Sequence, residues 1–323
     1  MRQTVFVLAA LAALCAPAAA RVILVPDSAS TIQAGINMSS SGDTVLVAPG
    51  TYTENIDWSA KSITLASHFL TSGDTMYIDS TVIDANHSGM VIECRTGVDT
   101  TALISGFTIK NAGTSNGVGV YCSCASPRIT HNIIEDNVIS SDGAGVYIDG
   151  GASPIVERNV IRHNQTSTWG DGIYVFDGSS PRVRWNVLYD NGVTKGGAAS
   201  RRDPARIVGG RMVEPDKEAG PFVTNGGGVL ITDCQGSATK PAIHNNTIVD
   251  NVATDPGGGI FSNRAWPDIR NNIVVSSFVD FFTPVLSPEE VSLLRGSPAS
   301  PFAPQALPCF NTTMSWSDSH DTV

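Results

Sequence analysis

The chain has 323 residues and a formal net charge of −10, from 30 acidic and 20 basic side chains. This acidity argues against nucleic acid or an anionic membrane surface as the principal partner. Glycine is abundant, with 31 residues, as is typical of a protein with many turns between β-strands.

Residues 1–20 have the features of a secretory signal peptide. Arg2 supplies a positive start, an apolar run extends from Val5 to Leu14, and the small residues Ala18 to Ala20 precede the expected cleavage site. The apolar run is too short to span a bilayer, and no later run is long enough. The mature protein is therefore expected to be secreted, either extracellular or in the periplasm or at the cell surface, with no membrane span.

Residues 22–58 are predicted to begin the folded domain. Val22–Val25 and Thr44–Val47 alternate as strands, and Ser30–Gln33 is a capping box that would begin a short helix ending near Met38. Pro49–Tyr52 is expected to turn the chain away from the second strand. A helix at this point would cover the open end of a stack of coils, where strand edges are otherwise unpaired.

One repeated pattern dominates the chain from Ser126 to Ser277. Its frame is P-x-aliphatic-x-x-N-x-aliphatic-x-x-N, followed by a loop and then G-x-G-aliphatic-aromatic. The first asparagine of each copy recurs at steps of 27, 27, 60 and 26 residues, at Asn132, Asn159, Asn186, Asn246 and Asn272. Such a period indicates one small unit stacked on copies of itself, and short strands separated by turn residues indicate a coil of a parallel β-solenoid.

Stacked coils would lie about 4.8 Å apart, so each column of the repeat becomes a ladder of similar residues. The recurring asparagines are predicted to form an internal ladder at a turn, since asparagine tolerates left-handed backbone geometry and its amide can bond to the next coil. The long step from Asn186 to Asn246 indicates an inserted loop near residues 192–225. Residues 284–323 lose the pattern and are predicted to be an irregular C-terminal cap or tail.

Thr31–Ile36 and Gly42–Ile56 resemble the N-terminal signature of secreted right-handed parallel β-helix proteins of the pectin-lyase-like superfamily, and the later copies resemble its parallel β-helix repeat. The resemblance implies an all-β, right-handed parallel β-helix over residues 21–283, export, and a common association with polysaccharides. It does not imply one reaction, since the superfamily includes lyases, hydrolases, epimerases and non-catalytic surface proteins. The sequence lacks the G-H-G and R-I-K signatures of polygalacturonases and the D-P-H-E signature of alginate epimerases.

Function on repeat scaffolds gathers on the variable loops and on the strand face beside them. Alternation along the strand after each loop turns a column of side chains outward, namely Tyr121, Tyr147, Tyr174, Leu230 and Phe261. Together with Trp169 in a loop and with Arg201 and Arg202 in the insertion, this column predicts a polysaccharide-binding surface, because aromatic rings suit the C–H faces of sugars. Alternatively, the rings only cover the solenoid and pack beneath the loops.

The residues near this face could support two kinds of polysaccharide cleavage, β-elimination and hydrolysis. β-Elimination on a uronic-acid polymer needs a group that neutralises the carboxylate and a base, for which Arg158, Arg184 and His163 are candidates. Hydrolysis needs two carboxylates on one face, and Asp171 and Asp142 are candidates one coil apart. The sequence thus leaves three functions open: a polysaccharide-binding protein, a polysaccharide lyase (or hydrolase), and a structural module for adhesion or display.

A second polar column contains Asp136, His163, Asp190 and Asp250. Stacked carboxylates suit Ca²⁺, but no ligand motif of defined spacing accompanies them, which favours plain turn-forming residues with the histidine relieving their repulsion. No cofactor is therefore expected to be required, although Ca²⁺ stays an alternative. Five cysteines follow the signal peptide, and Cys94 could pair with Cys122 or Cys124, which are about one coil away.

Overall fold

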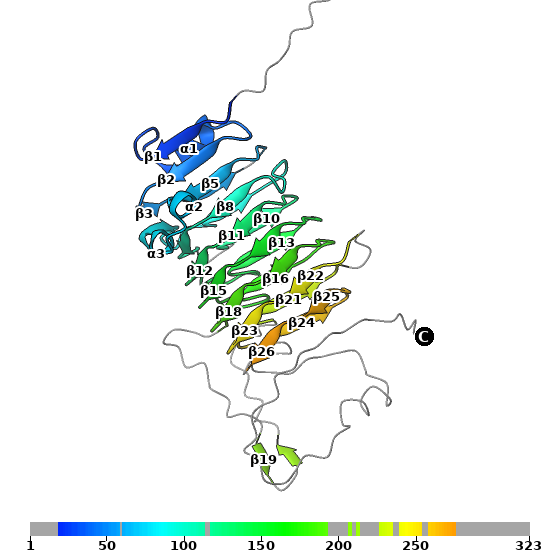
Figure 1. The fold of residues 1–323 in the computed structure, drawn as a ribbon. Helices are drawn as coiled ribbons and strands as arrows, with labels where there is room; N and C mark the ends of the chain where they lie inside the picture. Colours follow the sequence, from blue (N-terminus) through cyan, green and yellow to red (C-terminus); the bar gives the residue numbers. More distant parts are fainter. Residues whose placement is uncertain are drawn as a thin grey trace, which may run out of the picture.

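The computed structural model describes residues 19–58, 60–113, 117–192, 206–208, 211–213, 226–234, 239–253 and 258–275. Within these residues the chain winds through three short strands per coil, and strands of successive coils pair in parallel to form three long sheets, which we call A, B and C (Figure 1). The predicted parallel β-helix is therefore confirmed. None of the described helices is long and apolar enough to cross a membrane.

The strands are three or four residues long and follow one another around the coil in the order A, B, C. Sheet A contains β1 (Val22–Val25), β2 (Thr44–Val47), β5 (Thr64–Ser67), β8 (Leu103–Ser105), β11 (Arg128–Thr130), β14 (Ile155–Glu157), β17 (Arg182–Arg184), β22 (Ala242–His244) and β25 (Asp268–Arg270). Sheet B contains β3 (Gly50–Thr53), β6 (Thr81–Asp84), β9 (Thr108–Lys110), β12 (Ile133–Glu135), β15 (Val160–Arg162), β18 (Val187–Tyr189), β23 (Thr247–Val249) and β26 (Ile273–Val275). Sheet C contains β4 (Ile56–Trp58), β7 (Ile92–Cys94), β10 (Val120–Ser123), β13 (Val146–Asp149), β16 (Ile173–Val175), β21 (Val229–Thr232) and β24 (Ile260–Asn263).

The core lies inside the coil, where each sheet contributes columns of aliphatic side chains in register. In sheet A the central residues of successive strands stack with 0% exposure, namely Val45, Leu65, Ile104, Ile129, Val156, Val183 and Ile243. Sheet B supplies the matching column of Ile83, Ile109, Ile134, Ile161, Leu188 and Ile248. β-Branched side chains suit this arrangement because they pack well on a pleated surface.

The first asparagine ladder, Asn132, Asn159, Asn186, Asn246 and Asn272, occupies the turn between sheets A and B. Asn132 donates from Nδ2 to Oδ1 of Asn159 over 3.1 Å, and Asn159 donates in the same way to Asn186 over 3.0 Å. The main-chain amide of each asparagine also donates to the next Oδ1, and Nδ2 of Asn159 reaches the Ile129 carbonyl at 2.9 Å. Since these amides are at most 3% exposed, the predicted internal ladder is confirmed.

Of the two reasons that predicted asparagine at this turn, the hydrogen bonds are confirmed and the left-handed backbone conformation is wrong. The left-handed conformation falls on the residue before each ladder asparagine, including His131 (φ 54°), Arg158 (φ 54°) and Trp185 (φ 56°). The asparagine therefore serves through its hydrogen bonds alone, and these offset the cost of about 1–2 kcal/mol for a left-handed residue with a side chain. A second asparagine ladder, not foreseen as such, follows sheet B at Asn137, Asn164, Asn191 and Asn251, with Nδ2 to Oδ1 distances of 2.8–3.0 Å.

Helix α1 (Ile32–Met38) covers the N-terminal end of the solenoid, as predicted, with Ile32 and Ile36 buried. The capping box is wrong, because Thr31 is the N-cap and accepts from the Ala34 amide at 3.0 Å. A carboxylate from the next coil completes the helix start: Glu54 accepts from the amides of Ile32 and Gln33, both at 2.9 Å. Each end of the helix is thereby joined to the following coil, since Lys61 Nζ donates to the Ile36 carbonyl at 2.6 Å.

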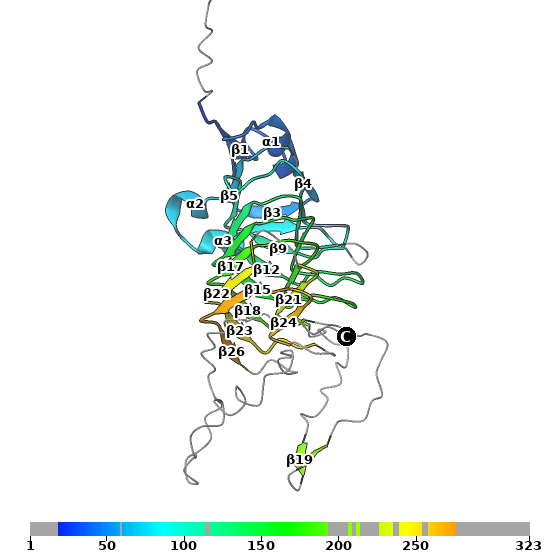
Figure 2. The same ribbon diagram turned by 90° about the vertical axis from the view of Figure 1, so that its right-hand side faces the viewer.

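Other parts of the N-terminal half differ from expectation. Gly50–Thr53 is strand β3 rather than part of a turn, because it pairs with β6 in sheet B. Two short helices that the sequence did not predict, α2 (Phe69–Ser72) and α3 (Met76–Ser80), leave the stack beside β5 and β6 (Figure 2). Neither has the length or periodicity that sequence patterns require.

Within the insertion, β19 (Arg206–Val208) and β20 (Arg211–Val213) form an antiparallel pair. The rest of 193–225, the predicted signal peptide as far as residue 18, and the C-terminal region from residue 276 lie outside the described residues. Cys94 and Cys122 are register partners on β7 and β10, both buried and present as free thiols, so the suggested disulfide is not formed.

Replacing Asn159 with alanine is expected to lower the free energy of unfolding by about 3–5 kcal/mol, because buried partners in both neighbouring coils lose their hydrogen bonds. Urea unfolding followed by circular dichroism would measure the change. Asn263→Ala is the matched control, since Asn263 is exposed at the end of β24, and its effect should stay within about 0.5 kcal/mol. Equal stabilities of the two variants would contradict a stabilising role for the ladder.

Candidate functional site

The outer face of sheet C carries the column of side chains predicted from the repeat. Tyr121, Tyr147 and Tyr174 are register partners on β10, β13 and β16, followed by Leu230 on β21 and Phe261 on β24. In the other direction Glu93 on β7 precedes Tyr121, and Asp57 on β4 precedes Glu93. The column therefore begins with two carboxylates and continues with three tyrosines.

The tyrosine rings pack against one another. The ring centroids of Tyr121 and Tyr147 are 5.3 Å apart, and those of Tyr147 and Tyr174 are stacked at 4.8 Å. Tyr174 is only 1% exposed, whereas Tyr121 and Tyr147 are half-buried. The predicted exposed aromatic column is thus interrupted, with Tyr121, Tyr147 and Phe261 partly exposed, and the alternative of packing beneath the loops holds for Tyr174.

Glycines allow the loops to approach these rings. Gly143 and Gly170 both have positive φ, of 71° and 78°. A Cβ added to Gly143 would lie 2.6 Å from Cβ of Tyr147, and one added to Gly170 would lie 2.5 Å from Cβ of Tyr174. Any other residue at either glycine would displace the loop from the column.

The phenol groups of the column stay protonated in the physiological range. Burial raises the pKa of Tyr121 to about 12, and burial likewise raises the pKa of Tyr174 to about 12. The hydroxyl of Tyr121 donates to Oδ2 of Asp149 at 2.7 Å, which orients it at the edge of the column. These groups can therefore donate and accept hydrogen bonds, as sugar hydroxyls require, without carrying charge.

Trp169 is exposed beside this column. It lies in the loop between β15 and β16 with 40% of its surface exposed, and its carbonyl accepts from the Gly143 amide at 2.8 Å. That bond links the loops of two successive coils. An exposed indole on the loop that leads into the tyrosine column is a surface on which a sugar ring can stack. Phe261 is half-buried two coils further on, and Arg201 and Arg202 lie outside the described residues.

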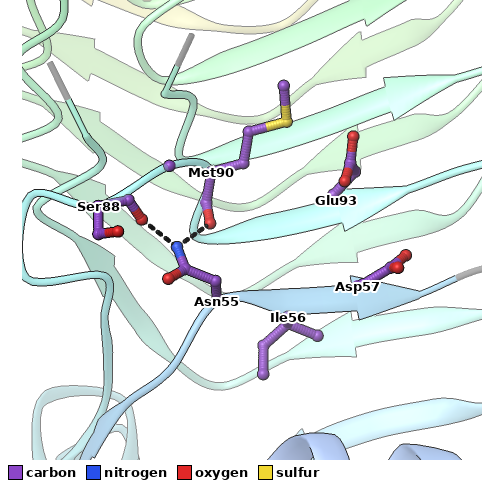
Figure 3. Close-up of a pocket in the computed structure, with 7 residues that line it drawn as sticks. Asn55, Ile56, Asp57, Ser88, Met90 and Glu93 are labelled. Atoms are coloured by element: carbon purple, nitrogen blue, oxygen red, sulfur yellow. Dashed lines mark hydrogen bonds between the residues drawn. The ribbon is translucent and has the colours of Figure 1, made fainter. Parts of the chain in front are cut away.

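A shallow pocket of about 270 Å³ lies at the start of the column, lined by Asn55, Ile56, Asp57, Ser88, Gly89, Met90 and Glu93 (Figure 3). Asn55 shapes its wall by donating from Nδ2 to the carbonyls of Ser88 and Met90, the latter at 2.6 Å. Asp57 and Glu93 project from adjacent strands to the same side. Sequence reasoning missed both carboxylates because they precede the recognisable repeats.

Asp171 does not form a surface pair with Asp142. It is fully buried, where Oδ1 accepts from the Thr166 amide at 2.7 Å and Oδ2 has no hydrogen-bond partner among the described residues. Burial raises the pKa of the Asp171 carboxyl well above its ordinary value. A carboxyl that solvent cannot reach supports neither hydrolysis nor metal binding.

The candidates for elimination do not converge on sheet C. Arg158 and Arg184 lie at the turn between sheets A and B, where both guanidinium groups approach Glu157 and the ring of Trp185. His163 lies at the next turn, after sheet B, with Nδ1 3.7 Å from Asp136 and Nε2 3.7 Å from Asp190. Base and carboxylate-neutralising groups are therefore on separate parts of the coil.

The column of Asp136, His163, Asp190 and Asp250 has the arrangement expected of turn residues. All four have positive φ, between 52° and 55°. His163 lies on the coil between those of Asp136 and Asp190 and approaches one carboxylate with each ring nitrogen. In the part of the chain that the structure describes, no group of three or more His, Cys, Asp and Glu side chains is placed to hold a metal ion.

The family model of the right-handed β-helix region matches residues 68–274 of the sequence. The chain belongs to this family. The match covers the described coils from α2 to β26 and agrees with the parallel pairing of all three sheets.

A comparison with curated proteins found no match. Among solved structures, this β-helix protein is similar to an alginate lyase from Paenibacillus sp. str. FPU-7, with 12% sequence identity and a TM-score of 0.32. The similarity covers 80% of this chain and 97% of that chain. It is too distant to bear on function.

The buried carboxyl of Asp171 lowers the free energy of unfolding of the β-helix by an amount that depends on pH. Below the ordinary carboxyl pKa of 3.8 the group is protonated both folded and unfolded, and it contributes nothing to the pH dependence of stability. As the pH rises above that value the unfolded chain loses the proton while the folded chain keeps it, so stability falls by about 1.4 kcal/mol per pH unit until the raised pKa is reached.

Asp171→Asn is therefore expected to be more stable than the wild type at pH 7, with a difference that shrinks as the pH falls and vanishes near pH 3.8. Thermal unfolding from pH 3.5 to 8 would measure it. Ser167→Ala, an uncharged change in the same loop, is the control and should show no such trend. A constant difference between Asp171→Asn and wild type at every pH would contradict the buried, protonated carboxyl.

Proposed function

We propose that this β-helix protein is exported and binds a neutral polysaccharide along the outer face of sheet C. The observation that carries the proposal is the half-buried pair Tyr121 and Tyr147, whose ring centroids are 5.3 Å apart, together with exposed Trp169 in the loop that leads into the next strand of the same sheet. Such rings offer apolar faces to sugar C–H groups, and the protonated phenols offer hydrogen bonds. A polymer lying along the solenoid axis would meet Tyr121 and Tyr147 on adjacent coils, about 4.8 Å apart.

Electrostatics favours a neutral polymer over a polyuronate on this face. Asp57 and Glu93 stand in the column, Asp149 accepts from Tyr121, and Asp142 lies in the loop above. Arg95 pairs with Glu93 and so compensates only one of these carboxylates. A chain of uronic acids would meet like charges here, which disfavours association. For this reason the lyase alternative is not proposed for sheet C.

Trp169→Ala should weaken binding to a neutral polysaccharide about tenfold, because the exposed ring would no longer contact a sugar. Affinity electrophoresis of the full chain on a panel of neutral and acidic polysaccharides, with and without EDTA, would measure this. Trp266→Ala is the matched control, since Trp266 is 46% exposed but outside the sheet C column. If no polymer binds, or if Trp169→Ala and Trp266→Ala lose affinity equally, the result favours the alternative that the protein is a structural module.

A second candidate function, glycoside hydrolysis, is favoured by one observation. Asp57 and Glu93 are register partners that line the pocket at the start of the tyrosine column. The strands that carry them are about 4.8 Å apart, close to the separation of about 5–5.5 Å between the carboxyl groups of retaining glycosidases. A sugar bound on the neighbouring tyrosines would extend into this pocket.

Hydrolysis would appear as new reducing ends during incubation with whichever neutral polymer binds. Asp57→Asn and Glu93→Gln should each lower that rate at least a hundredfold while the affinity for the polymer changes little. Asp79→Asn, an exposed carboxylate on α3, is the control. Binding without any release of reducing ends would leave a binding protein and exclude the hydrolase.

A further inference from the structure

Sheet A carries a band of arginines that runs along the solenoid axis on its outer face and at its turn into sheet B. The members of this arginine band are Arg128, Arg158, Arg182, Arg184 and Arg270. The corresponding segments of five successive coils are 128–131, 155–158, 182–185, 242–245 and 268–271, of which 242–245 carries no arginine. These segments hold five arginines and two carboxylates, Glu157 and Asp268, so their net charge is +3 in a chain of −10.

A buried carboxylate organises the centre of the band. Glu157 is 0% exposed although it faces outward from β14. Its Oε1 accepts from Nε and Nη2 of Arg128, the former at 2.7 Å, and its Oε2 accepts from Nε of Arg184 at 2.8 Å. Burial by itself would raise the pKa of Glu157, but the hydrogen bonds from Arg128 and Arg184 hold it below the ordinary value. Glu157 is therefore a fixed anion that orients two guanidinium groups.

Trp185 fixes the same groups from the other side. The guanidinium carbon of Arg158 is 4.7 Å from the centroid of the Trp185 ring, and that of Arg184 is 4.5 Å from it. Cation–π contacts of this kind hold the planes of the guanidinium groups and shield part of their surface from water. The ring itself is still 43% exposed, so it lies at the surface of the band and not beneath it.

Several guanidinium N–H groups of the arginine band remain available to bind a ligand after these contacts. The side chains of Arg128, Arg158 and Arg184 are 44%, 45% and 33% exposed. Arg184 uses only Nε toward Glu157, and Arg158 approaches Oε1 of Glu157 no closer than 3.5 Å. Arg182 is exposed on β17, with no ion pair to any residue that the structure describes. Burial and the nearby Arg158 lower the pKa of His131, so that this neighbour is neutral at pH 7 and does not add to the charge.

We propose that the arginine band is a second binding site, specific for an acidic polysaccharide whose carboxylate or sulfate groups lie along the solenoid axis. Guanidinium groups bind such oxyanions through two parallel hydrogen bonds, and their preset planes reduce the entropy lost on binding. The three consecutive coils of Arg128, Arg158 and Arg182 repeat the positive charge about every 4.8 Å, which suits a slender polymer with a charge on each sugar. Exposed Trp185 adds a ring face or edge for the sugar itself.

This site is independent of the neutral-polymer site on sheet C, because the turn between sheets A and B is the corner of the coil opposite sheet C. A polyanion bound there avoids the carboxylates of Asp57, Glu93 and Asp142. The two faces therefore differ in charge as well as in aromatic content. One molecule could hold a neutral and an acidic polymer at the same time.

The test uses the full chain with polygalacturonate, a highly sulfated glycan, a neutral glucan and single-stranded RNA as probes, over a range of salt concentrations. Arg158→Gln/Arg182→Gln is the main variant, since both side chains are exposed and Glu157 keeps its bonds to Arg128 and Arg184. We expect at least tenfold weaker binding to one or both acidic polysaccharides. The slope of log affinity against log salt should fall by about two, one per lost cation.

Lys110→Gln/Arg264→Gln is the matched control, because it removes the same charge from sheet B and from the turn after sheet C. It should leave the affinity within about twofold, as should Trp169→Ala. Arg158→Lys/Arg182→Lys should restore the salt slope but only part of the affinity, since lysine lacks the paired donors. Thermal unfolding of each variant would show that the fold persists.

Three results would overturn the proposal: no acidic polysaccharide binds the wild type, the main variant and the control lose affinity equally, or RNA binds more tightly than both acidic glycans. Failure of the sheet C proposal is distinguishable from each of these, because it would appear as unchanged neutral-glucan binding in Trp169→Ala.

Discussion

The fold depends on hydrogen bonds that run along the solenoid axis and repeat at every coil. The strands supply part of them, but at the turns, where the strand pattern stops, the two asparagine ladders continue it. Asn159 illustrates the constraint, because its amide bonds to the coil before it and to the coil after it while fully enclosed. Only a side chain with both donors and an acceptor on one planar group can do this. The asparagines therefore determine the register of everything attached to the turns.

Columns of side chains follow from that register, and the two candidate binding faces are such columns. On sheet C the register aligns tyrosines with the carboxylates of the earlier coils. At the turn between sheets A and B it aligns His131, Arg158 and Trp185, each in a left-handed conformation. The ladder asparagine holds the backbone there, so the preceding residue projects outward with few packing constraints. In each turn the ladder asparagine thus stabilises the fold, and the residue before it supplies the exposed side chain.

The repeat made much of this predictable from the sequence. The period identified the solenoid, the first asparagine ladder and the outward column of sheet C, because all three depend on spacing alone. Burial was harder: Tyr174 occupies an outward position, yet the loop at Gly170 covers it, and no spacing rule gives the path of a loop. Helices α2 and α3 were not predicted because each is only a little longer than one helical turn, too short for a helical period to be recognised. The cluster around Glu157 required comparing the residues that precede each ladder asparagine, which would have aligned Glu157 with Arg184 and His131 with Arg158.

The insertion between β18 and β21 leaves the stack undisturbed. Asn186 and Asn246 are 60 residues apart, yet their amides bond at 3.0 Å, the same distance as between Asn159 and Asn186, which are 27 residues apart. The corner after sheet B thus tolerates a long departure of the chain without distorting the coils on either side. Entire segments inserted at this corner can therefore be exchanged while the coils of the solenoid keep their arrangement. The regular stacking of the coils therefore sets the distances between the loops that extend from their corners.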